Sequence, residues 1–203
     1  MRTAPTTALF LAAAISCSAC APIPMQVYVA VAPESNIIYS SCVYNTHVPT
    51  GVRVSAGDVS ANVSLSKYKG NSYVQLRLDI PSGTTLKFDD DVVQITTENP
   101  RTSSQAVLPN ISLVDTPIVN SYSNMAAIQK LWLPVRAQLV GERLYAGGNG
   151  FDKHFWLATY VDTSSATDIN IEFPRFSLNG VPTQAIQVRF KSQILVAVAL
   201  INC

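Results

Sequence analysis

The sequence predicts an all-β protein built as a single antiparallel β-sandwich. Three observations support this fold class. About a dozen short strand-like segments follow one another at the spacing of hairpins. Several of them alternate between apolar and polar residues, which is typical of strands with one buried and one solvated face. Hydrophobic residues make up 48% of the chain, enough for a sizeable core.

Length and charge restrict the classes of protein and partner. At 203 residues the chain fits one domain, and 13% charged residues is low against roughly a quarter in an average soluble protein. The formal net charge of +1 falls to about zero if Arg2 is removed with a signal peptide. The densest basic stretch, Arg189 and Lys191, lies in an alternating segment rather than in a basic patch. We therefore expect no nucleic-acid partner.

The first half of the chain contains the clearest strands. Residues 26–32 and 37–44 read as two strands, followed by a turn near residues 49–51. Residues 59–68 alternate, and so do residues 73–80. The side chains expected to point inward from these two segments are Val59, Ala61, Val63, Leu65, Val74, Leu76, Leu78 and Ile80.

The middle of the chain is less regular. Leu86 and Phe88 lead into a solvated acidic turn at residues 89–91, and Val93 and Ile95 open the next strand. Residues 98–105 look polar and turn-rich, and residues 107–114 return to strand character. At most one short helix is expected near residues 123–131, because apolar residues there have helical spacing behind a Ser or Asn cap.

The remaining strands are expected at residues 133–140, 154–161 and 169–173. Asn179-Gly180 is a hairpin signal, although Pro182 predicts a loop longer than two residues. Lys191-Ser192 should separate the last two strands. The apolar run at residues 194–201 predicts a strand buried on both faces in the middle of a sheet. Together these elements predict a sandwich that is immunoglobulin-like in general architecture.

The amino terminus predicts export. Arg2 precedes an apolar core at residues 8–15, and this run is too short to span a bilayer, so it fits a cleaved signal peptide. Ser18, Ala19 and Cys20 resemble a bacterial lipobox, the motif at which lipoprotein signal peptidase cuts before a lipidated cysteine. This resemblance implies a lipid anchor of palmitate-type acyl chains on Cys20.

Two alternatives remain open for this cleavage. Cys17 stands where the lipobox usually has leucine, and residues 14–17 form a second possible lipobox that would lipidate Cys17. Ordinary cleavage after Ala19 or Ala21 would instead release the protein into the periplasm without lipid. We favour a signal peptide at residues 1–19, a lipidated tether at residues 20–25 and a sandwich domain at residues 26–203.

The other two cysteines support the choice of Cys20. Cleavage before Cys20 leaves Cys42 and Cys203 as an even pair, which can form a disulfide in an oxidising compartment. Closing a loop of about 160 residues would stabilise the fold by at most ~5 kcal/mol. Ala21, rather than an aspartate, follows Cys20; in lipoproteins of this kind that implies anchoring at the outer membrane, on its periplasmic side.

No catalytic, metal or cofactor motif stands out. His47 and His154 have no second histidine nearby, and Asp152 is the one acid close to His154, so we expect no metal site. The acids at 89–91 do not follow the EF-hand pattern. Neither a nucleophile elbow nor a phosphate-binding loop is present. A hydrolase whose paired acids lie far apart in the chain remains an alternative.

The stretch at residues 143–156 is the candidate site for a partner. Three glycines lie among aromatic and charged residues there, a composition typical of contact loops. A plain hairpin loop whose aromatics fold back on the sandwich is the alternative. The candidate binding residues are Arg143, Tyr145, Phe151, Asp152, His154 and Trp156.

These features predict a non-enzymatic bacterial envelope lipoprotein, a binding or structural module that faces the periplasm. Its expected partners are the membrane, through the N-terminal lipid, and an envelope protein or glycan. One alternative is an inhibitor or immunity protein that inserts the 143–156 loop into a periplasmic lytic enzyme. The other is a glycan-acting envelope enzyme.

Overall fold

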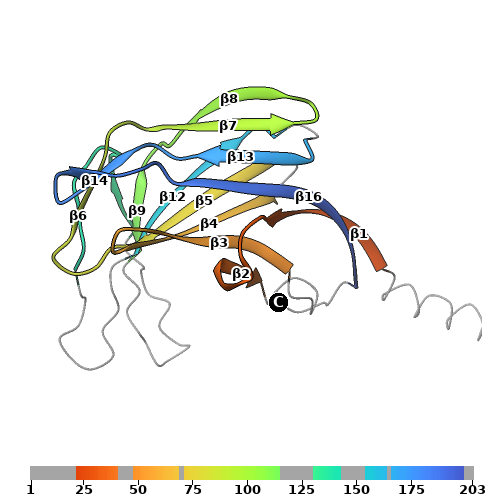
Figure 1. Cartoon of the computed structure of the whole chain (residues 1–203), viewed down its shortest axis with the longest axis horizontal. Coiled ribbons are helices and arrows are strands. Elements are labelled where there is room, and N and C mark those ends of the chain that lie inside the picture. Colours follow the sequence, from red (N-terminus) through yellow and green to blue (C-terminus); the bar gives the residue numbers. More distant parts are fainter. Residues whose placement is uncertain are drawn as a thin grey trace, which may run out of the picture.

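The computed structural model describes residues 22–40, 48–68, 71–114, 130–142, 154–163 and 166–198. Within these residues the protein is all-β, with one 3-10 turn, η2, at Glu34–Asn36. The strands form three antiparallel sheets, consistent with the predicted sandwich (Figure 1). None of the described residues belongs to a helix long and apolar enough to cross a membrane.

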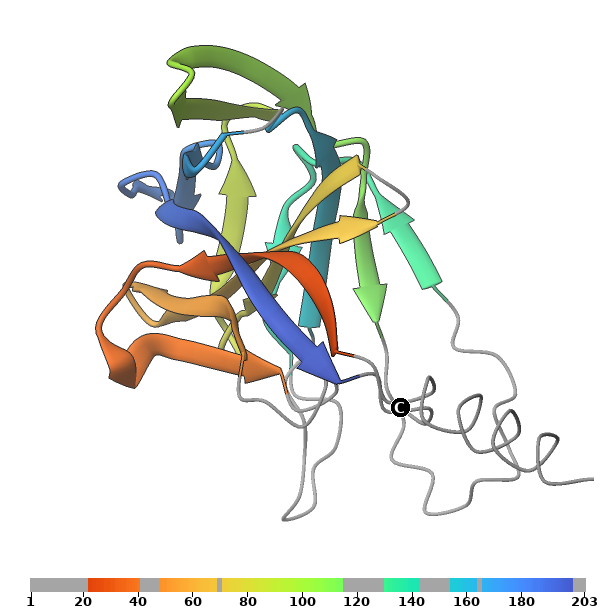
Figure 2. The same cartoon turned by 90° about the vertical axis from the view of Figure 1, so that its right-hand side faces the viewer.

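The first sheet has the order β1-β16-β13-β7-β8. Figure 2 shows the long strand β16 running beside β1. All pairings in this sheet are antiparallel. Its strands are β1 (Pro22–Ala30), β16 (Gln187–Val198), β13 (Asp168–Glu172), β7 (Val92–Glu98) and β8 (Thr102–Val107).

The second sheet has the order β10-β9-β12-β5-β4-β3-β2 and carries the candidate site described below. Its central strands, β4 and β5, are the two segments with the clearest alternation in the sequence. The strands are β10 (Lys130–Leu133), β9 (Ile111–Val114), β12 (His154–Val161), β5 (Asn71–Asp79), β4 (Val59–Tyr68), β3 (Val48–Ala56) and β2 (Ile37–Ser40).

The third sheet is small and has the order β11-β6-β14-β15. It contains β11 (Leu139–Val140), β6 (Thr85–Phe88), β14 (Phe176–Leu178) and β15 (Val181–Pro182). The hairpin between β14 and β15 has a two-residue loop, shorter than Pro182 predicted. Asn179 and Gly180 both have positive φ, 50° and 79°, which Asn-Gly adopts readily, and Pro182 is accommodated in β15 beyond the turn.

One hydrophobic core is shared by the three sheets. The inward-facing residues predicted for β4 and β5 are all buried, which confirms the register read from the alternation. Other large, fully buried side chains come from the remaining strands and their connections. They include Leu86, Phe88, Ile95, Phe173, Phe176 and Phe190.

Buried hydroxyl groups join the first sheet to the second. The Tyr28 hydroxyl on β1 lies 3.0 Å from Ser72 Oγ on β5 and 2.7 Å from Thr163 Oγ1 beyond β12. Ser72 and Thr163 are also hydrogen-bonded to each other. Because each hydroxyl both donates and accepts, the three groups satisfy one another away from water.

Three strand boundaries differ from the sequence prediction. The segment 98–105 is mostly extended, because β8 pairs its polar residues with β7 and closes that hairpin by a turn at residues 99–101. The segment 133–140 is not one strand, since β10 and β11 belong to different sheets. No break occurs at Lys191-Ser192, because β16 continues through them while pairing with β1.

The position of the last strand is partly as predicted. β16 lies between β1 and β13, inside its sheet. However, Ile194 is 74% exposed, so the expectation that this run is buried on both faces is wrong at its first residue. Beyond residue 191, β16 has β1 as its one pairing partner among the described strands, and a two-stranded ribbon leaves side chains uncovered.

Two further predictions concern segments of which the structure describes only a part. The short helix near residues 123–131 lies outside them except at its end, where Lys130 and Leu131 are extended in β10. Residues 22–25, which were predicted to belong to a tether, lie in β1, whose Pro22 pairs with Val198.

Candidate functional site

The outer face of the second sheet carries an aromatic trough of about 450 Å³. Trp132 on β10 and Tyr160 on β12 are 59% and 56% exposed, unusually open for such large side chains. Trp156 on β12 and Tyr73 on β5 are half-buried beside them. The trough is lined by Tyr73, Gln75, Pro109, Asn110, Ser112, Trp132, Trp156, Ala158, Thr159 and Tyr160.

Strand register gathers these residues, because directly paired residues of neighbouring strands project to the same face of a sheet. Ser112 on β9 is paired with Trp132 on one side and with Trp156 on the other. Trp156 is paired in turn with Arg77 on β5. The row crosses six strands from β10 to β3 and contains Trp132, Ser112, Trp156, Arg77, Asn62 and Arg53. We call it the cross-strand row.

Two tyrosines on neighbouring strands also line the trough. Tyr73 and Tyr160 are directly opposite each other on β5 and β12. Their ring centres lie 5.1 Å apart at an interplanar angle of 55°, a favourable tilted contact. The hydroxyl-bearing rings thus form a wall that is apolar on its faces and polar at its tips.

Polar groups lie between the aromatic rings. The amides of Gln75 and Asn110 line the trough, and Ser64 Oγ donates to Gln75 Oε1 at 3.4 Å. The Thr159 hydroxyl donates to the carbonyl of Val107 at 2.8 Å. Aromatic faces with interspersed amides and hydroxyls are suited to a ligand that has both an apolar face and many hydroxyl groups.

Asp79 lies at the polar end of this face and is hydrogen-bonded to several neighbouring side chains. Its carboxylate accepts two hydrogen bonds from Arg77, at 3.0 and 3.2 Å. His154 Nδ1 lies 2.5 Å from Asp79 Oδ1, and Asn62 Nδ2 donates to Oδ2 at 3.5 Å. The Arg77 guanidinium also lies 5.8 Å from the centre of the Trp156 ring, so a cation–π contact connects this network to Trp156.

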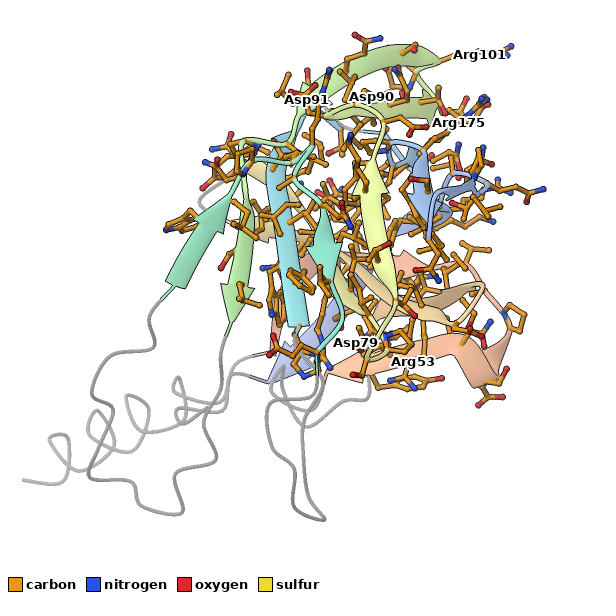
Figure 3. The ribbon with its side chains drawn as sticks, turned by 90° about the vertical axis from the view of Figure 1, so that its left-hand side faces the viewer. Arg53, Asp79, Asp90, Asp91, Arg101 and Arg175 are labelled. Carbon is orange, nitrogen blue, oxygen red and sulfur yellow. The ribbon has the colours of Figure 1, made fainter. Side chains whose placement is uncertain are left out.

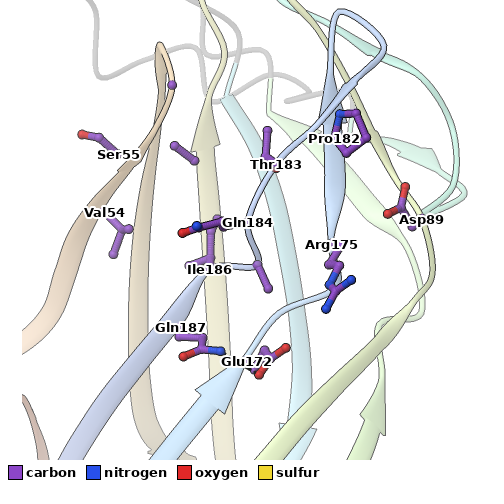
Figure 4. Close-up of a pocket in the computed structure, with 13 residues that line it drawn as sticks. Val54, Ser55, Asp89, Glu172, Arg175, Pro182, Thr183, Gln184, Ile186 and Gln187 are labelled. Carbon is purple, nitrogen blue, oxygen red and sulfur yellow. Dashed lines mark hydrogen bonds between the residues drawn. The ribbon is translucent and has the colours of Figure 1, made fainter.

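A larger and more polar cavity of about 860 Å³ lies between the β3–β4 hairpin and residues 182–187. In the view of Figure 4, Arg175 lies between Asp89 and Glu172. These two acids are far apart in the sequence, as a paired-carboxylate hydrolase would allow. However, Asp89 is exposed, and one oxygen of Glu172 accepts a hydrogen bond from Gln187 at 2.9 Å. The general acid of a glycosidase usually occupies a drier, apolar setting.

The structure places two of the predicted partner-binding residues. His154 and Trp156 belong to strand β12, which confirms the strand predicted at residues 154–161 and pairs with β5, so these two residues do not lie in a loop. Their role in binding a partner stays a prediction. They project from the same face, as residues two apart on a strand do. Arg143, Tyr145, Phe151 and Asp152 lie outside the described residues.

The cysteines and His47 are likewise outside the described part of the chain. The described residues therefore do not test the predicted lipid on Cys20 or the predicted disulfide between Cys42 and Cys203. Among the described residues, no group of three or more His, Cys, Asp or Glu side chains is arranged to hold a metal ion.

The sequence did not indicate most of the trough. Trp132 directly follows the segment 123–131 in which a short helix was expected, and Tyr73 and Tyr160 lie in the predicted strands 73–80 and 154–161. The available signal was the presence of large aromatics at solvent-facing positions of alternating strands, where polar residues are usual. The pairing of His154 with Asp79 had no local signal, because the two residues are 75 positions apart.

Comparison with known proteins gives no further guidance: no family model matches the chain, and no curated protein or solved structure is significantly similar to it.

Proposed function

We propose that this protein is a bacterial envelope lipoprotein whose β-domain faces the periplasm and binds a glycan without catalysing a reaction on it. The observation that carries the proposal is the aromatic trough. A sugar ring has an apolar face of C–H groups and a rim of hydroxyls. The rings of Trp132 and Trp156 offer stacking surfaces, and Gln75, Asn110 and Ser112 offer hydrogen bonds.

The anchor in this proposal is a lipidated Cys20 that follows a cleaved signal peptide. β1 begins at Pro22, two residues after Cys20. Two fully extended residues span at most ~7 Å, so the anchor would hold the start of β1 close to the bilayer surface. The domain would then stay attached to the periplasmic surface of the outer membrane. We also propose that its general architecture is immunoglobulin-like.

The trough favours a glycan over the other candidates. An inhibitor of a lytic enzyme would rely on the 143–156 segment, whereas the trough is built mainly from strands β5, β9, β10 and β12. An envelope enzyme would be expected to use the polar cavity, where Asp89 and Glu172 occur together. Replacing both by their amides, Asp89→Asn and Glu172→Gln, tests this second function: loss of a measurable turnover on peptidoglycan or polysaccharide would establish an enzyme.

Glycan binding is tested by a panel of envelope polysaccharides, including peptidoglycan, titrated against the purified protein. We expect Trp132→Ala to weaken binding at least tenfold, because an aromatic contact of this kind is worth ~1 kcal/mol or more beyond the area it buries. The matched control is Val181→Ala on β15, which also truncates an exposed apolar side chain but lies outside the trough. Equal binding by both variants would contradict the proposal.

The anchor is tested separately. Cys20→Ala should leave the protein in the soluble periplasmic fraction and unlabelled by a palmitate analogue. Labelling that persists in Cys20→Ala and disappears in Cys17→Ala would move the lipid to Cys17.

A further inference from the structure

The cross-strand row changes from aromatic to basic side chains along its length. At the β10 end it presents Trp132 and Trp156, and at the β3 end it presents Arg77 and Arg53. Neighbouring strands are ~4.8 Å apart, so Arg53 lies ~14 Å from Trp156 and ~24 Å from Trp132 along the row. A ligand that lies across the strands would therefore meet aromatic rings first and guanidinium groups afterwards.

The two arginines differ in what they can still bind. The Arg77 guanidinium is held by both oxygens of Asp79. Arg53 is exposed, and its partner among the described residues is the neutral amide of Asn62, whose Oδ1 accepts from Arg53 Nε at 3.1 Å. None of the ion pairs formed among the described residues includes Arg53, whereas Arg77 is paired with Asp79.

Asn62 also determines how Arg53 is oriented. Its Oδ1 accepts from Arg53, and its Nδ2 donates to Asp79 Oδ2 at 3.5 Å, so it joins Arg53 to the Asp79 network. Nε is occupied by Asn62, and within the described part of the chain the two terminal nitrogens of Arg53 have no hydrogen-bond partner. A guanidinium presents such a pair of N–H groups in the geometry that binds both oxygens of a carboxylate.

We propose that the cross-strand row is specific for acidic glycans, and that Arg53 binds a sugar carboxylate while Trp132 and Trp156 stack on neighbouring sugar rings. The inference rests on the proposed glycan-binding function and names the class of ligand for the same face. Figure 3 shows that Arg53 and Asp79 lie near each other at one end of the domain, whereas Arg101 and Arg175 lie at the other.

The test compares matched ligands. Oligogalacturonate, oligomannuronate and hyaluronan oligosaccharides are each titrated by calorimetry together with the carboxyl-reduced, neutral form of the same chain. We expect at least one acidic form to bind about tenfold or more tightly than its neutral counterpart, because hydrogen bonds to a charged group are worth more than neutral ones. Raising the salt concentration should narrow this difference, since the charges are exposed.

Substitutions test whether Arg53 causes the difference in affinity between the acidic and the neutral forms. Arg53→Gln should bind the acidic and the neutral forms equally, and Arg53→Lys should recover part of the preference, since it keeps the charge without the paired N–H groups. Asn62→Ala, which removes the oxygen that accepts from Arg53 Nε, should reduce the preference for the acidic form. Arg101→Gln, which removes an exposed arginine at the far end of the domain, should behave as the wild type.

The outcomes separate the two proposals. If acidic and neutral chains bind equally and both depend on Trp132, glycan binding stands and the acidic specificity is overturned. A preference for the acidic form that survives Arg53→Gln also overturns it. If neither form of any chain binds, the acidic specificity is overturned, and the panel of envelope polysaccharides decides separately whether the glycan-binding function stands.

Discussion

The guanidinium carbon of Arg77 lies 5.8 Å from the centre of the Trp156 ring, and the same guanidinium forms two hydrogen bonds with Asp79. Asp79 in turn contacts His154, which begins the strand that carries Trp156. These contacts restrict the half-buried Trp156 ring on the outer face of the sheet. Fixed rings bind with a smaller loss of side-chain entropy than mobile ones.

The first prediction concerns this carboxylate. Asp79→Asn keeps the shape of the side chain and removes the charge that holds Arg77 and His154. We expect the free energy of unfolding to fall by about 1 kcal/mol, since the pair is partly exposed. Urea denaturation measures the change. Asp58→Asn, an exposed turn residue, is the control, and equal stability of the two variants would contradict a role for the network.

The second prediction concerns the buried hydroxyls. Tyr28→Phe leaves Ser72 and Thr163 with each other but removes the group that links them to β1. We expect a loss of about 1–2 kcal/mol, the usual effect of removing one partner of a buried hydrogen bond. Ser72→Ala should have a similar effect. The double variant should lose less than the sum of the single losses if the three groups act together; strict additivity would show that they do not.

The third prediction is a pH dependence from Asp168 and Arg189. Arg189 Nε donates to Asp168 Oδ1 at 2.7 Å. This hydrogen bond lowers the pKa of Asp168 below its ordinary value, burial opposes the shift, and the charges of Arg189 and Lys191 add to the lowering. A carboxyl whose pKa is lower in the folded state stabilises the fold above the unfolded pKa of about 3.9 and loses that contribution as pH falls through the folded value.

Asp168→Asn should therefore be less stable than the wild type at neutral pH, and the difference should shrink as pH falls below about 4. The effect should be small and reduced by salt, because Arg189 is exposed. Denaturant midpoints measured between pH 3 and pH 7 provide the check. A difference that stays constant over this range would show that the ion pair contributes nothing.

The fourth prediction compares two glycines. A Cβ on Gly141 would lie 1.9 Å from the carbonyl oxygen of Pro81, whereas a Cβ on Gly83 would meet nothing within 4 Å. Gly83 has a φ of +83°, so Gly83→Ala adds backbone strain of ~1 kcal/mol. Gly141→Ala forces backbone apart and should cost at least ~3 kcal/mol. Thermal unfolding of both variants shows which one loses more stability. A smaller loss for Gly141→Ala than for Gly83→Ala would contradict the close packing at Gly141.

The fifth prediction is the bridge between Cys42 and Cys203. Oxidised protein should migrate faster than reduced protein on a denaturing gel, because a cross-link over most of the chain keeps the unfolded form compact. Cys203→Ser should abolish this difference, while Cys20→Ala should retain it. Identical mobility of reduced and oxidised wild type would exclude the disulfide.

The sequence by itself determined the strands that have strong local patterns. β4, β5 and β12 were located from alternation or β-rich composition, because burial on one face leaves a period of two along a strand. Where composition and pairing disagreed, the prediction failed. The polar strand β8 looked like a turn, and one continuous β16 looked like two strands, because each is defined by its neighbour in the sheet rather than by its own residues.

Trp156 was already a predicted binding residue, but the tertiary structure decided which residues assemble around it. Trp132, Trp156 and Arg53 lie in three separate parts of the sequence, and nothing local to any of them indicates the others. The register of antiparallel strands aligns them on one face, and register depends on the whole sheet. The sequence thus predicted which residues would form strands and face the core, whereas long-range pairing determined which outward side chains became neighbours.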